Sequence, residues 1–200
     1  VVEPYAINFD KNTKPSRNDR YITSINVTGE QIANCEFEVG NASVYFDKTA
    51  DEAAQINCYA GEQLTVNISK AGSWMNAYVF VDMENDGQFS FNPASTDQSG
   101  TDVMSFSFYS GDPATDDSGV NSEGTALTGQ NRNTMMLPSF AAPSDAGVYR
   151  IRFKMDWNSV DPGGQLAVGN NAGILGNGGA IVDALLVVEA KDTGIESAQA

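Results

Sequence analysis

The chain has 200 residues, 41% of them hydrophobic, with 26 acidic residues, 11 basic residues and no histidine. Its net charge of −15 argues against nucleic acid and against an anionic membrane surface as partners, because both attract lysine and arginine. The missing histidine excludes Ser-His-Asp and Cys-His catalysis and removes a common zinc ligand. No apolar run approaches the roughly eighteen residues of a membrane-spanning helix, so no membrane insertion is expected.

The composition predicts a single all-β domain. Nineteen glycines, many Asn, Ser, Thr and Asp residues and few Leu favour strands joined by turns over long helices. A chain of this length can form one sandwich with a substantial core. We predict an antiparallel β-sandwich, jelly-roll-like, over residues 1–200, with an irregular segment at 1–20 and a tail or linker at 190–200.

Strands are expected where apolar residues alternate or run together between Gly, Asn and Asp. Tyr149–Asp156 alternates best, which predicts that its apolar side chains face the core while Arg150 and Arg152 lie on an outer face in water. Ile181–Val188 is more continuously apolar and should be a central strand. Residues 110–133 and 158–179 are predicted loops. The other expected strands are 21–27, 35–39, 43–46, 55–59, 63–68, 75–81 and 103–109.

The only two cysteines, Cys35 and Cys58, each lie in a short strand-like run. A disulfide between them would stabilise the fold by about 3 kcal/mol if the geometry permits. We expect this disulfide, and the alternative is two buried free thiols. The disulfide would place the protein outside the cytoplasm.

An acidic turn follows the apolar strand at 78–81. Asp86-Gly87 between two apolar runs predicts a hairpin turn. The same residues match the first half of a calcium loop, in which oxygen ligands alternate before a glycine. Pro93 stands where that loop would need a glutamate, so calcium is a candidate cofactor beside a purely structural turn. The candidate metal-binding residues are Asp82, Glu84, Asp86 and Gln88, and further ligands would have to come from residues such as Asp156, Asp161 or Asp183.

Three segments occur in an order that resembles the GEVED domain, a β-sandwich module of secreted and surface proteins of bacteria, notably Bacteroidetes. They are the turn at 82–89, the stretch from Pro143 to Arg152, and Gly179-Ala-Ile-Val-Asp183. The last segment keeps the glycine and the aspartate of the Gly-Glu-Val-Glu-Asp motif, while Ala and Val replace its glutamates. The resemblance implies a non-catalytic accessory module with an extracellular, cell-surface or periplasmic location.

Trp74 and Trp157 are candidate platforms for a sugar ring, because an exposed indole offers a flat apolar surface. Trp157 opens a loop in which Asn158 and Asp161 are further candidate ligand-binding residues. We therefore predict a carbohydrate-binding module whose partner is a glycan or another surface protein. Core tryptophans would favour a structural or cell-adhesion module. A carboxylate-based glycosidase is the third alternative, disfavoured because the turn at 85–87 breaks the shared face of the three carboxylates.

Overall fold

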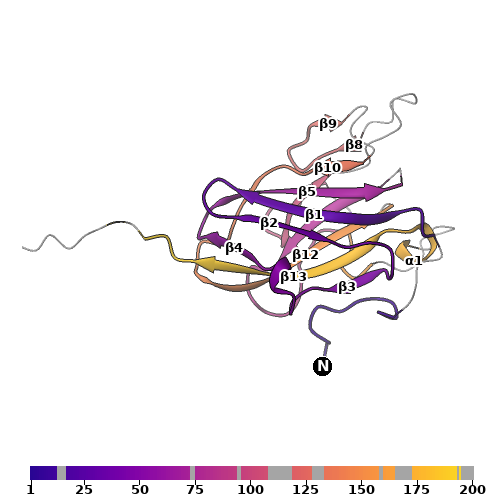
Figure 1. The fold of residues 1–200 in the computed structure, drawn as a ribbon, viewed down its shortest axis with the longest axis horizontal. Helices are drawn as coiled ribbons and strands as arrows, with labels where there is room; N and C mark the ends of the chain where they lie inside the picture. Colours follow the sequence, from indigo (N-terminus) through magenta and orange to yellow (C-terminus); the bar gives the residue numbers. More distant parts are fainter. Residues whose placement is uncertain are drawn as a thin grey trace, which may run out of the picture.

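Two β-sheets pack face to face in the computed structural model, which confirms the predicted all-β sandwich (Figure 1). Helical structure in the described part of the chain is limited to the short helix α1 (Gly173–Asn177) and the 3-10 turn η1 (Glu52–Ala54). No helix among the described residues has the length and apolar character needed to cross a membrane. The structure describes residues 1–12, 17–72, 75–93, 96–107, 119–127, 133–157, 160–164, 173–192 and 194.

The five-stranded sheet is antiparallel, with strand order β10-β5-β1-β2 and with β11 also paired to β5. The clearest alternation is in β5, where every second side chain is buried, as expected for a strand with one face on the core. The strands are β1 (Tyr21–Gly29), β2 (Asn34–Glu38), β5 (Gln63–Ala71), β10 (Thr134–Met136) and β11 (Phe140–Ala141).

The six-stranded sheet has the order β3-β13-β12-β6-β7, and β4 also pairs with β13. Both β3 and β4 run parallel to β13, whereas the other pairs are antiparallel. β13 has neighbours on both sides and is central, as its continuous apolar sequence predicted. The strands are β3 (Tyr45–Asp47), β4 (Ile56–Tyr59), β6 (Asn76–Val81), β7 (Val103–Ser107), β12 (Gly147–Asp156) and β13 (Ala180–Glu189), while β8 (Gly119–Val120) and β9 (Ala126–Leu127) form a separate pair.

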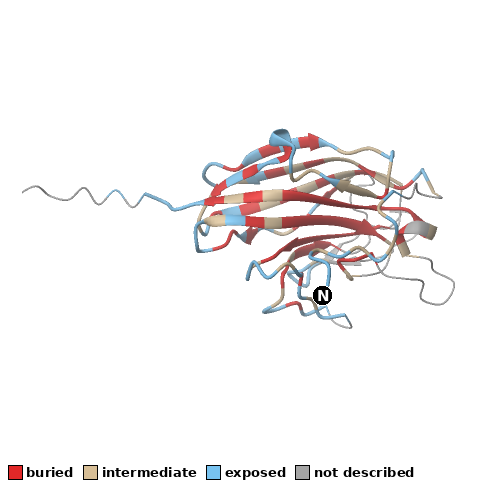
Figure 2. Ribbon diagram, turned by 90° about the horizontal axis from the view of Figure 1, so that it is seen from below, coloured by how far each residue is buried: buried red, intermediate tan, exposed pale blue. Residues whose placement is uncertain are grey.

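The three strands β13, β12 and β6 at the middle of the six-stranded sheet are largely buried on both faces (Figure 2). The inner face of this sheet meets the five-stranded sheet in the main core. Its outer face, which points away from the other sheet, carries two smaller apolar clusters covered by the N-terminal segment and by loops. One cluster contains Tyr5, Tyr78, Phe80, Phe89, Phe91, Val103, Phe106 and Val160, and the other contains Ile7, Phe9, Val44, Tyr45, Ile174 and Ile181.

This covering corrects the prediction that the charges of β12 face water. Arg152, Lys154 and Asp156 are each exposed by 1% or less. Burying such charges is costly unless they are paired, and each of them is: Arg152 with Asp183, and Lys154 with Asp156 at 2.8 Å. Alternation along one strand cannot reveal that a distant segment covers its polar face.

The predicted hairpin at Asp86-Gly87 is also wrong. Residues 88–93, directly after Gly87, form no strand, and the antiparallel neighbours of β6 are β7 and β12. Gly87 does adopt the expected left-handed conformation, with φ of 85°. The turn is real, but it opens a long connection to β7 instead of a two-strand ladder.

The predicted disulfide is absent, since Cys35 and Cys58 are both buried free thiols. Cys35 lies in the five-stranded sheet and Cys58 in the six-stranded sheet. The Cys35 Sγ is directed at the carbonyl oxygen of Ala53, at 3.3 Å, rather than into a sulfur–sulfur bond. The argument from a disulfide to an oxidising compartment therefore has no support.

Candidate functional site

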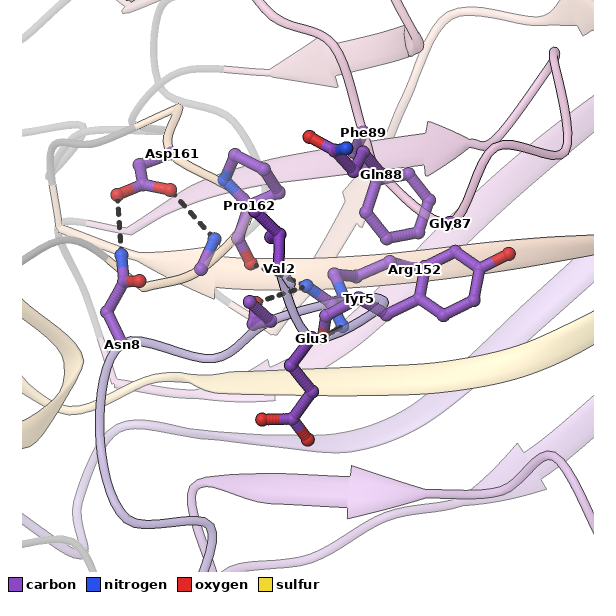
Figure 3. A pocket seen from close by; sticks show the side chains of 12 residues that line it. Val2, Glu3, Tyr5, Asn8, Gly87, Gln88, Phe89, Arg152, Asp161 and Pro162 are labelled. Atoms are coloured by element: carbon purple, nitrogen blue, oxygen red, sulfur yellow. Dashed lines mark hydrogen bonds between the residues drawn. The ribbon is translucent and has the colours of Figure 1, made fainter.

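A pocket of about 150 Å³ opens on the outer face of the six-stranded sheet (Figure 3). Three segments far apart in sequence form it: the N-terminal segment, the chain just after the acidic turn, and the loop at 161–163. Two backbone hydrogen bonds hold them together, from Tyr5 N–H to the Gly87 carbonyl at 2.7 Å and from Asn8 N–H to the Gly163 carbonyl at 2.8 Å. The lining residues are Val2, Glu3, Tyr5, Ala6, Asn8, Gly87, Gln88, Phe89, Arg152, Asp161, Pro162 and Gly163.

Arg152 lies under the pocket and contacts all three segments. Its Nε and Nη2 donate to the two carboxylate oxygens of Asp183, at 2.6 and 2.8 Å. The remaining three N–H groups donate to backbone carbonyls of Tyr5, Ala6 and Pro162. Its guanidinium also lies 4.8 Å from the centre of the Phe89 ring. All five donors are engaged within the chain, so Arg152 shapes the pocket and has no donor left for a ligand.

Asp183 is buried and forms a second ion pair, with Arg150. The Arg150 Nη2 donates to Asp183 Oδ2 at 2.9 Å, and the hydroxyl of Tyr45 donates to the same oxygen at 2.9 Å. Burial lowers the pKa of Arg150, but the charge of Asp183 outweighs it and raises the pKa above its ordinary value. The Arg150 guanidinium lies 4.6 Å from the centre of the Tyr5 ring, which extends this network to the N-terminal segment.

Tyr5 connects the pocket to the acidic turn. Its hydroxyl donates to Asp82 Oδ2 at 2.8 Å. Burial and this hydrogen bond to a carboxylate raise the pKa of Tyr5 to about 12. Tyr5 therefore stays protonated at neutral pH and acts as a donor to Asp82.

The polar groups of the pocket come from Asn8, Gln88 and Asp161. The Asn8 Nδ2 donates to Asp161 Oδ2 at 3.0 Å, and Gly163 N–H donates to Asp161 Oδ1 at 2.8 Å, which orients the carboxylate. Gln88 is exposed. Its backbone N–H donates to Asp86 Oδ1, and its side-chain amide has no hydrogen-bond partner among the described residues. With Phe89 beside them, these groups offer donors, acceptors and an apolar surface to a small polar ligand.

The acidic turn brings Asp82, Glu84 and Asp102 together, with one carboxylate oxygen of each within 4.8 Å of the others. Hard oxygen ligands of this kind suit calcium. The two buried members already accept protein donors: Asp82 accepts the N–H groups of Asp86 and Gly87. Asp102 accepts those of Met83 and Ser90, at 3.2 and 2.7 Å. The charge of Asp102 raises the pKa of Glu84.

The structure therefore does not bring the four predicted metal-binding residues together at one site. Asp82 and Glu84 belong to the acidic group, whereas Asp86 does not and Gln88 lines the pocket. The third carboxylate comes from Asp102, which lies far along the chain. The suggested additional ligands are engaged elsewhere: Asp156 pairs with Lys154, Asp183 binds two arginines, and Asp161 lines the pocket.

The predicted sugar-binding residues are likewise not gathered at one site in the described part of the chain. Trp74 and Asn158 lie outside the described residues. Trp157 is half-buried, with the Arg20 guanidinium 4.9 Å from the centre of its ring. Asp161 is in the pocket, beside Asn8 and Gly163.

Tyr5, Asn8 and Asp102 were missed by reasoning from the sequence. One signal was present, because Tyr5, Ile7 and Phe9 alternate with more exposed residues in a segment that was predicted to be merely irregular. Such alternation is typical of an extended segment that covers an apolar face. Asp102 carries no local signal, since its role depends on its proximity to Asp82.

No known protein family matches this sequence, and no curated protein has significant sequence similarity to it. The resemblance to the GEVED domain stays a prediction. The residues that carry it lie near one another, since Arg152 contacts both Asp183 and Phe89.

Proposed function

We propose that this protein is a non-catalytic accessory module of a bacterial cell-surface or secreted protein and that it binds a glycan in the pocket beside Tyr5. The observation that carries the proposal is the lining itself: amide and carboxylate groups of Asn8, Gln88 and Asp161 next to the ring of Phe89. Sugars present hydroxyls around an apolar ring face, so they need both kinds of contact. The resemblance to surface modules supports the location.

The size of the pocket supports a small ligand unit. Sites for drug-sized molecules have volumes of about 300–1,000 Å³, and this pocket has about 150 Å³. A single sugar residue or the end of a chain is the appropriate scale. The segments around the pocket are held by Arg152 and by backbone hydrogen bonds, so binding would need little ordering of the chain.

A structural or cell-adhesion module is the second candidate function. One observation favours it: Arg152 uses all of its donors inside the chain. In that case the hydrogen bonds and ion pairs of Arg152, Asp183 and Arg150 only stabilise the fold. Neither proposal requires calcium, for which Asp82, Glu84 and Asp102 are the candidate ligands.

The test is a screen of neutral oligosaccharides against the purified protein, with Gln88→Ala as the site variant and Gln31→Ala as the matched control. Both glutamines are exposed, so neither change should alter the fold. We expect a neutral glycan to bind and Gln88→Ala to weaken binding about tenfold, the scale of one lost hydrogen bond. Wild-type protein that binds no neutral glycan would favour the structural module, and equal loss in Gln31→Ala would place the site elsewhere.

A further inference from the structure

A second group of polar side chains lies where β12 ends and β13 begins, beside α1 (Figure 1). Arg20, just before β1, is brought there by a hydrogen bond from Gly179 N–H to its carbonyl oxygen at 3.0 Å. The Arg20 Nη1 donates to the carbonyl oxygen of Asn177 at 3.0 Å, and its guanidinium lies over the Trp157 ring. None of these residues lines the pocket beside Tyr5.

This group holds hydrogen-bond donors that the described chain leaves unused. Arg20 is only 8% exposed, yet it forms no ion pair in the described part of the structure, and its side chain donates there to a single acceptor, the carbonyl oxygen of Asn177. Asn177 is 9% exposed, and its buried side-chain Nδ2 has no hydrogen-bond partner. Burial lowers the pKa of Arg20, with Arg17 acting in the same direction. A buried donor without an acceptor, as at Asn177 Nδ2, is rare and costly in native proteins.

The nearby carboxylate does not satisfy this need. Asp19 faces Arg17 instead, with Arg17 Nη2 donating to its Oδ2 at 2.6 Å. Arg20 is therefore a mostly buried cation without a paired anion, next to an unpartnered amide. Arginine is the side chain best suited to bind a carboxylate through two parallel hydrogen bonds.

We propose that Arg20 and Asn177 bind the carboxylate group of an acidic sugar and that Trp157 contacts its ring. The guanidinium and the free amide would supply donors to the carboxylate oxygens. The indole supplies an apolar surface beside them, which a sugar ring can use and a bare carboxylate cannot. The net charge of −15 does not prevent this, because repulsion from distant charges is screened beyond about 8 Å at physiological ionic strength.

The acidic-sugar site is independent of the neutral-glycan pocket. The two sites share no residue among those named, so either can fail alone. Neutral ligands test the pocket through Gln88, and charged ligands test this site through Arg20 and Asn177.

The experiment compares a trimer of galacturonic acid with its methyl ester, which has the same rings without the charge. Binding is measured by calorimetry, and the side-chain NMR signals of Arg20 Nε–H and Asn177 Nδ2–H are followed in the wild-type protein. The variants are Arg20→Gln and Asn177→Asp, and Lys48→Gln controls for the loss of one positive charge at a remote ion pair. Asn177→Asp has nearly the same shape but places an acceptor where the unpartnered amide was.

We expect the acid form to bind, the ester to bind at least tenfold more weakly, and the Arg20 and Asn177 side-chain signals to shift on binding. Asn177→Asp should abolish binding and raise the melting temperature, because the new carboxylate occupies the role of the ligand. Lys48→Gln should bind like the wild type. Equal binding of acid and ester, or unchanged binding in both site variants, would overturn the proposal. Equal binding of an acetylated glutamate peptide would overturn the assignment to a sugar.

Discussion

Arg152 and Asp183 face each other across β12 and β13 as a fully buried, two-bond ion pair, with Nε–Oδ1 of 2.6 Å and Nη2–Oδ2 of 2.8 Å. The pair fixes the outer face of the six-stranded sheet, because the remaining donors of Arg152 hold the N-terminal segment and the loop at 161–163. The pocket therefore depends on a contact that is itself closed to solvent.

Asp183→Asn is expected to destabilise the fold by about 3–5 kcal/mol, because it leaves two arginines near an uncharged partner in a buried position. The free energy of unfolding from urea titration measures this. Asp47→Asn changes an exposed carboxylate at the end of β3 and should cost little. A loss below about 1 kcal/mol in Asp183→Asn would mean that the outer-face network is not a stabilising element.

Glu62→Gln should lower the free energy of unfolding by at least about 1–3 kcal/mol. Glu62 holds two turns, one between β1 and β2 and one between β4 and β5. Glu62 is fully buried, and its two oxygens accept backbone N–H groups from Gln31, Ile32, Ala33 and Tyr59 at 2.7 to 2.9 Å. Gly29 makes room for it, since a Cβ there would lie 2.2 Å from Glu62 Oε1. The variant replaces one acceptor with a donor that faces other donors.

The same residue predicts a pH dependence. Burial opposes ionisation of Glu62, but its four backbone hydrogen bonds outweigh this and lower its pKa below the ordinary value. Its stabilising contribution is therefore fully present above the unfolded pKa of about 4.3 and is lost as the pH falls through the lower folded value. The gap in unfolding free energy between wild type and Glu62→Gln should narrow in that acidic window. The exposed Glu36→Gln control should show no such gap.

Calcium is expected to leave the unfolding free energy of the wild type unchanged, because Asp82 and Asp102 already hold the acidic turn through backbone donors. Thermal unfolding in millimolar calcium and in chelator measures this. A stabilisation of about 2.7 kcal/mol at a hundredfold excess over Kd, lost in Glu84→Gln, would instead establish a calcium site.

Both thiols should resist alkylation in the folded protein. Burial raises the pKa of Cys35, and burial with the charge of Glu62 raises the pKa of Cys58 to about 12, so little thiolate is present at neutral pH. Mass spectrometry after treatment with iodoacetamide should show no addition without urea and two additions with it. An intact mass two hydrogens lower would show that the disulfide forms after all.

The sequence predicted the sandwich because its strands are locally consistent. β5 alternates in sequence and in burial, and β13 is continuously apolar and central. The prediction for the charges of β12 failed, since alternation describes one strand and not what covers it. Likewise, Gly87 adopted the expected backbone conformation while the chain after it did not pair with β6.

For the candidate site, the sequence by itself determined the chemical groups available: no histidine, an acidic turn at 82–86, and polar residues such as Gln88 and Asp161 next to loops. Only the tertiary structure decided which of them meet. Tyr5 reaches Asp82, Asn8 reaches Asp161, and Arg20 reaches Asn177 from positions far apart in the chain. The physical reason is that a local pattern indicates the conformation of one segment only. A site forms where charged groups and apolar faces of segments far apart in sequence come into contact.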